Sequence, residues 1–163
     1  MLTGSAEQSE DVARHSLRQC LLDLRHVLSK VKLEAIRADG DSIGLQSSMV
    51  VVDVTRFEQQ VARGTPEALQ EAMDLYRGEL LEGLSINERA FEDWLRAERE
   101  RLRSLAVGAF KKLLAHHIRQ KATDAGVQVA IRFLVLEPFD ESVHRALMRL
   151  YACLLYTSDA ADE

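Results

Sequence analysis

Proline, glycine and cysteine are all scarce in this chain. Two prolines and eight glycines among 163 residues leave long stretches in which nothing interrupts a helix. This scarcity favours a mostly helical protein. The two cysteines, Cys20 and Cys153, are far apart and match no metal-binding or redox spacing, so the simple interpretation is a reduced chain in the cytoplasm.

Long apolar runs are also missing. No stretch approaches the length of a membrane span, and the polar start, MLTGSAEQSE, does not resemble a signal peptide. We therefore expect no membrane partner. A chain of 163 residues with an apolar content of 47% has room for one or two small domains with a real core.

Positive charge is in short supply overall, but it is unevenly distributed. The formal net charge of -5 argues weakly against a dedicated nucleic-acid binder. Residues 11–37, however, carry six lysines and arginines against three acids, whereas residues 67–103 carry ten acids against six arginines. We therefore interpret the basic amino-terminal part and the acidic remainder separately.

The longest periodic pattern runs from Phe91 to Ile118. Its apolar residues, Trp94 among them, recur at steps of three and four, which predicts one continuous helix of about eight turns with a buried stripe. Arginine and glutamate alternate over its other face, so that face is interpreted as salt-bridged and solvated. The alternative is a polar surface that binds a partner. Such a helix needs helical neighbours on both sides in sequence.

Turn and cap signals predict those neighbours. One helix starts at Asp53 or Thr55 and ends at Gly64, and a second starts at Thr65-Pro66 and ends near Gly78. The long helix breaks over residues 121–126, a further helix spans 127–136 before Glu137-Pro138, and Asp140 caps the last. Met49–Val52 is interpreted as a strand or a buried linker. The 34 residues from Leu105 to Pro138 have the length of one tetratricopeptide-type unit.

The basic part begins with a predicted helix over residues 12–28. Its apolar residues form a stripe that we expect to be buried, and they are Val12 or Ala13, Leu17, Cys20, Leu21, Leu24 and Leu28. Arg14, Arg18, Leu22 and Arg25 fall within one quadrant, which we place opposite the stripe, with His15, Gln19 and His26 on its shoulder. By itself, such a basic face is more often a solvated surface than a DNA contact.

A predicted hairpin follows this helix. Strands over residues 33–37 and 42–46 flank Ala38-Asp39-Gly40-Asp41, where Asp-Gly supplies the positive φ that a tight turn needs. A basic helix followed directly by a hairpin is the end of a winged helix-turn-helix, which contacts the major groove and the neighbouring backbone. The candidate DNA-binding residues are Arg14, His15, Arg18, Gln19, Leu22, Arg25, Lys30 and Lys32.

Five segments resemble a known family in their order and spacing. They are ARHSLRQCLLDLRHVL, VDVTRFEQQV, ALQEAMDLYRGELLEGL, AFEDWLRAERERLRSLA and LEPFDESVHRALMRLY. Together they resemble the bacterial transcriptional activator domain, as found in the antibiotic-regulatory activator family, over roughly residues 11–152. The resemblance implies an OmpR-type winged helix that binds DNA, with a tetratricopeptide-like helical domain packed behind it. It also implies a transcription activator that contacts promoter DNA, in its full-length form, and RNA polymerase. The present chain is expected to bind DNA weakly at best, because the helices that set the angle of the recognition helix in the family are missing. We leave a homodimer open.

The resemblance sets the expected domain limits. Residues 1–48 would be the carboxyl-terminal part of the winged helix and residues 49–152 the helical domain, both shorter than in the family. Residues 153–163, CLLYTSDAADE, are what one reading frame of a transposase-type sequencing adaptor encodes, so we interpret them as a non-native tail. The alternative is a natural helix extension, because Leu154 continues the apolar stripe of the last helix.

No catalytic constellation is present in the sequence. His116 and His117 are adjacent, point about 100° apart on a helix, and cannot clamp one metal ion. We therefore predict no enzyme, no cofactor and no metal. Two functional classes remain, which are a DNA-binding transcription activator and a helical protein–protein interaction module with no DNA binding.

Overall fold

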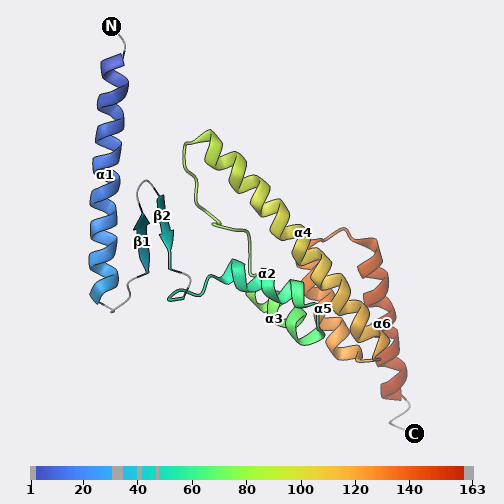
Figure 1. Ribbon diagram of the computed structural model, residues 1–163. Helices are drawn as coiled ribbons and strands as arrows, with labels where there is room; N and C mark the ends of the chain where they lie inside the picture. Colours follow the sequence, from blue (N-terminus) through green and yellow to red (C-terminus); the bar gives the residue numbers. More distant parts are fainter. Residues whose placement is uncertain (1–2, 31–34, 40–41, 47, 160–163) are drawn as a thin grey trace. The chain divides into compact units, whose positions relative to one another are not determined.

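Six helices and one hairpin make up the described part of the chain, residues 3–30, 35–39, 42–46 and 48–159 of a computed structural model (Figure 1). In order they are α1 (Thr3–Lys30), β1 (Ile36–Asp39), β2 (Ser42–Leu45), α2 (Asp53–Arg63), α3 (Pro66–Leu75), α4 (Arg89–Arg119), α5 (Thr123–Leu136) and α6 (Glu141–Asp159). The mainly helical class with a small hairpin is confirmed, while the tetratricopeptide-like and winged-helix descriptions stay predictions. Two compact units are present, residues 1–52 (the first unit) and 53–163 (the second unit).

In the first unit, α1 is longer and more exposed than predicted. It starts at Thr3 rather than at residue 12, because nothing between Thr3 and Asp11 stops a helix. The stripe predicted to be buried is mostly in solvent: Leu17 is 52% exposed and Leu24 48%, while Leu21 and Leu28 are half-buried. That prediction was wrong because periodicity shows only that the apolar residues share one face of the helix. Burial also requires another element that packs against this face.

The predicted hairpin is present, but its first strand spans Ile36–Asp39 rather than residues 33–37, so Ala38 and Asp39 are strand residues and not part of the turn. β1 and β2 pair antiparallel, with Ile36 opposite Leu45 and Asp39 opposite Ser42, and the Ser42 hydroxyl donates to the Asp39 carbonyl oxygen at 3.0 Å. Leu33, Gly40 and Asp41 lie outside the described residues. The segment from Met49 to Val52 is neither strand nor buried, since Val51 is 80% exposed. That part of the prediction was wrong because β-propensity alone provides no strand to pair with.

The second unit begins with two short helices, and the end of α2 and the start of α3 obey their predicted signals. Gly64 adopts φ 67° directly after α2, the left-handed conformation that terminates a helix at little cost for glycine. Thr65 is the N-cap of α3 and its hydroxyl accepts from the Ala68 amide at 3.3 Å, with Pro66 at the first helical position. The helix ends at Leu75, before Gly78, and Tyr76 is its C-cap.

Helices α2 to α6 pack in sequence order, each on the next, and α2 also contacts α4. A larger buried cluster joins α3 to α6, and it contains Leu69, Met73, Ala109, Phe110, Leu113, Leu114, Val127, Val129, Ala130, Phe133, Val143 and Leu150. A smaller one joins α2, α3 and α4, and it contains Phe57, Ala72, Leu102 and Ala106. The core of the unit therefore runs along the carboxyl-terminal two thirds of α4.

The amino-terminal part of α4 projects beyond the other helices of its unit (Figure 1). Leu95 is 1% exposed, but Trp94 is 50% exposed and lies against Phe91 with ring centroids 5.5 Å apart. The prediction that Trp94 is buried was therefore wrong. The aromatic ring belongs to the periodic pattern, but no described element covers that side of the helix.

The break between α4 and α5 is shorter than predicted. It comprises residues 120–122, with Lys121 in the left-handed region at φ 54°, and Gly126 lies inside α5. A Cβ on Gly126 would come within 3.2 Å of Leu150 Cδ1 on α6. Glycine is therefore used here because it lets α5 and α6 approach closely, and not as a helix breaker.

Three arginines of α4 predicted to face solvent instead join this helix to other parts of the unit. Arg99 donates to the carbonyl oxygens of Leu80 and Leu81 at 2.8 and 2.9 Å. Arg103 donates to the Leu136 carbonyl at 3.0 Å and to Glu137 at 3.1 Å, and Arg101 pairs with Glu58 of α2 at 2.5 Å as well as with Glu98. The face of α4 is salt-bridged as predicted, but it is not simply solvated.

Candidate nucleic-acid interface

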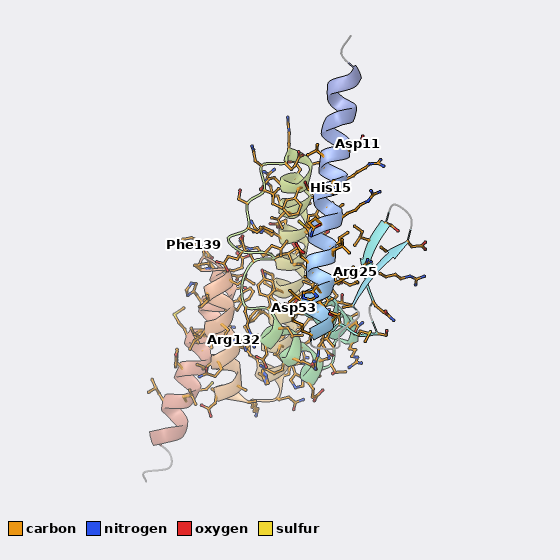
Figure 2. All side chains as sticks on the ribbon, turned by 90° about the vertical axis from the view of Figure 1, so that its left-hand side faces the viewer. Asp11, His15, Arg25, Asp53, Arg132 and Phe139 are labelled. Atoms are coloured by element: carbon orange, nitrogen blue, oxygen red, sulfur yellow. The ribbon has the colours of Figure 1, made fainter. Side chains whose placement is uncertain are left out.

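The basic side of α1 is built from residues spaced by four and seven along one helix. Arg14, Arg18 and Arg25 are all exposed, and at 100° per residue they fall within about 40° of one another. Leu22, on the same side, is 58% exposed. Figure 2 shows Asp11, His15 and Arg25 along this helix. The three guanidinium groups are therefore presented from one side of α1.

This basic side borders the apolar stripe rather than lying opposite it, so the predicted placement was wrong. Seven residues separate Arg14 from Leu21, which leaves them about 20° apart around the helix. A hollow of about 610 Å³ accordingly contains both kinds of side chain. Its lining residues are Arg14, Leu17, Arg18, Leu21, Leu22, Arg25, Ala38 and Ile43. The surface thus combines cations with exposed aliphatic groups from both α1 and the hairpin.

The other candidate residues lie near this surface or outside the described chain. His15 is exposed, and Gln19 donates its side-chain amide to Asp23 at 3.2 Å. Lys30 is the exposed last residue of α1, where a cation also complements the helix dipole. Lys32 lies outside the described residues.

The hairpin adds polar groups of its own. Arg37 on β1 is exposed and lies opposite Gly44 in the register. Guanidinium groups bind phosphate oxygens or the guanine edge, and an exposed hairpin can meet a neighbouring backbone. Chemically, the first unit can therefore hold a polyanion.

Within the described part of the second unit, the histidines and carboxylates do not form a metal site. The described residues include no group of three His, Cys, Asp or Glu side chains placed to hold a metal ion. The rings of His116 and His117 lie edge to face with centroids 5.5 Å apart, and partial burial together with the neighbouring His116 lowers the pKa of His117. Within the described chain, no helix is long and apolar enough to cross a membrane.

The comparison with protein families decides the identity of the second unit. Residues 52–162 match the model of the bacterial transcriptional activator domain. The chain belongs to this family. No curated protein and no solved structure matches the chain. The family is one of transcription activators and not of enzymes, which agrees with the prediction from the sequence.

The activator domain as matched includes residues 153–162, which the sequence suggested were a non-native tail. In the structure α6 continues through Asp159, and the half-buried Leu154 packs against the larger core cluster. The origin of this tail stays a prediction.

One feature of the activator domain escaped the sequence reasoning. Lys112, His116 and Arg119 line a groove beside the start of α3. Their spacing of four and three residues was visible in the sequence.

Proposed function

We propose that this chain is a DNA-binding transcription activator of the cytoplasm. In this proposal α1 and the hairpin contact promoter DNA, and the activator domain binds protein partners, RNA polymerase among them. The observation that supports it most directly is the set of exposed arginines, Arg14, Arg18 and Arg25, on one side of α1 beside an exposed hairpin. Family membership supports the role in transcription. A homodimer lacks a supporting observation and is not part of the proposal.

The three arginines have different roles in this proposal. Arg18 is central on the basic side and reads a base edge, where a bidentate guanidinium recognises guanine. Arg25 lies two turns further on and contacts the phosphate backbone, as does Lys30 or Lys32 near the hairpin. Exposed Leu22 and Ile43 border these cations and fit the apolar and sugar surfaces within a groove.

Binding isotherms of alanine variants at several salt concentrations, on cognate and on random duplex, test this assignment. Arg18→Ala should cost about 1–3 kcal/mol on the cognate duplex and relax the preference at one base pair. Arg25→Ala should weaken binding to both duplexes alike and reduce the salt slope by about one charge. Arg89→Ala is a matched control, since its side chain is 96% exposed on α4, in the other unit.

The alternative is a helical interaction module that does not bind DNA, which the exposed apolar stripe of α1 also favours. Equal binding of wild type and of all three arginine variants to both duplexes would favour this alternative. Salt-independent, weak association with DNA would lead to the same conclusion.

A further inference from the structure

Leu22 is an exposed aliphatic side chain that stands apart from the apolar stripe of α1. Its side chain is 58% exposed. Around the helix it lies about 100° from Leu21, which forms the edge of the stripe. The arc between these two leucines contains Arg14, Arg18 and Arg25. The stripe therefore ends on one side of the arginines, and Leu22 lies on the other side.

The position of Leu22 along the helix places it among the candidate DNA contacts. It lies one turn after Arg18 and one turn before Arg25, and all three side chains are exposed. Leu22 is also near the middle of the arc that the candidate residues cover, which extends from Arg14 round to Gln19. In a helix that enters a groove, side chains near the middle of the arc face the bases, whereas those at the edges meet the backbones. Leu22 is therefore placed to contact a base.

The chemistry of leucine restricts which base edge it fits. Its side chain neither donates nor accepts a hydrogen bond, so against the polar edge of guanine, adenine or cytosine it would leave a polar group without a partner. Among the four bases, only thymine presents a methyl group in the major groove. Contact between Leu22 and this methyl group would remove apolar surface from water on both partners.

We propose that Leu22 packs against the 5-methyl group of a thymine and is a specificity-determining residue of this chain. The inference rests on the proposed DNA binding by α1 and deepens it. Four residues advance about 6 Å along a helix, and successive base pairs are about 3.4 Å apart. For a helix that lies along the groove, the thymine is therefore about two base pairs from the guanine that Arg18 reads.

The test begins with duplexes that the full chain selects from a randomised pool at low salt, where phosphate contacts strengthen weak binding. Each thymine of the selected duplex is then replaced in turn by deoxyuridine, which lacks the methyl group but keeps the base-pairing edge. We expect one replacement to weaken binding in fluorescence anisotropy about fourfold, the factor that corresponds to about 0.8 kcal/mol for one buried methyl group.

Alanine variants connect this loss to one side chain. Leu22→Ala should bind the thymine and deoxyuridine duplexes equally, because the methyl group then has no partner. Leu24→Ala is the matched control, since Leu24 is 48% exposed on the same helix but lies on the stripe, about 160° from Leu22. It should discriminate between the two duplexes like wild type. Circular dichroism checks that both variants stay helical, as alanine in place of an exposed leucine should allow.

Equal affinity of wild type for the thymine duplex and for every deoxyuridine duplex would overturn the assignment of Leu22. Unchanged discrimination in Leu22→Ala, or an equal loss of discrimination in Leu24→Ala, would also overturn it. In each of these cases, weaker binding by Arg18→Ala and Arg25→Ala would show that α1 still contacts DNA and that only the role of Leu22 is wrong. If the pool yields no preferred sequence and both arginine variants bind like wild type, the proposed function fails as well.

Discussion

At the scale of single residues, Trp94 illustrates how an aromatic side chain can belong to a core-like pattern without contributing to a core. Its ring lies against the half-buried Phe91, and half of its surface stays in solvent. Leu113, five turns further along α4, is 1% exposed inside the larger cluster. The two residues share one helix but differ in what covers them.

Alanine substitutions at these two positions should therefore have different costs. Trp94→Ala should lower the free energy of unfolding by about 1 kcal/mol or less, because little apolar surface leaves a packed environment. Leu113→Ala should lower it by about 2–5 kcal/mol through lost burial and the cavity that remains. Urea denaturation of both variants measures the difference, and equal costs would mean that Trp94 is covered in solution.

At the scale of elements, arginines that the sequence places on the same charged face of α4 have different roles in the structure. Arg96 pairs with Asp93 on its own helix, and its side chain is 77% exposed, so it contributes little to stability. Arg103 instead satisfies the Leu136 carbonyl at the end of α5 and pairs with Glu137, whose hydrogen bond and charge raise the pKa of Arg103. Arg96 therefore adds little to the fold, whereas Arg103 joins the carboxyl-terminal end of α5 to α4.

The start of α6 depends on a single carboxylate. Asp140 Oδ1 accepts from the amides of Ser142 and Val143 at 3.0 and 3.2 Å, and Lys111 lies 3.0 Å from Oδ2. The Ser142 hydroxyl and then Lys111 hold the pKa of Asp140 well below its usual range. The cap thus joins the α6 terminus to α4.

Removal of this cap should have a pH-dependent cost. Asp140→Ala should lower the free energy of unfolding by about 1–2 kcal/mol at neutral pH. The folded-state pKa of Asp140 is depressed, so its stabilisation is complete above the unfolded pKa of about 4 and is lost as the pH falls through the folded pKa. Thermal melts at a series of pH values should therefore show that the difference in stability between wild type and Asp140→Ala becomes smaller from neutral to strongly acidic pH.

Asp124→Ala provides the comparison, since Asp124 is an exposed acid in the first turn of α5. It should cost less at neutral pH than Asp140→Ala. If the loss of stability in Asp140→Ala stayed constant through the acid range, the ionised carboxylate of Asp140 would be excluded as its cause.

At the scale of the whole molecule, the two units differ in what holds them together. The second unit has two buried clusters along α4, whereas Ala35 is the one buried residue among the described side chains of the first unit. Most described side chains of the first unit are thus exposed, whereas the second unit has a hydrophobic core that stabilises it.

Deletion of residues 153–163 tests how much the last segment adds to that stability. We expect a loss of about 1 kcal/mol or less, because a chain terminus carries little energy and Leu154 is the half-buried contact to the core. Leu154→Ala in the full chain should reproduce part of this effect in a thermal melt. A loss of cooperativity on deletion would instead identify the segment as native structure.

Much of the local structure could be predicted because its causes are local. The cap at Thr65-Pro66, the left-handed Gly64 and the stop at Glu137-Pro138 each depend on residues within one turn. Candidate cations could be named for the same reason. The sequence could not show whether another element covers a given side chain, and for this reason the apolar stripe of α1 and Trp94 were wrongly predicted to be buried.

The sequence by itself determined the order of the elements, most of their ends, and membership of the activator family, because period, caps and turn chemistry act between neighbours along the chain. Only the tertiary structure decided which faces are buried and where the charged groups find partners. Arg132 on α5 (Figure 2) donates to Asp74, 58 residues earlier in the chain, at 2.7 Å. Such contacts depend on how helices pack, and packing depends on all of their side chains together.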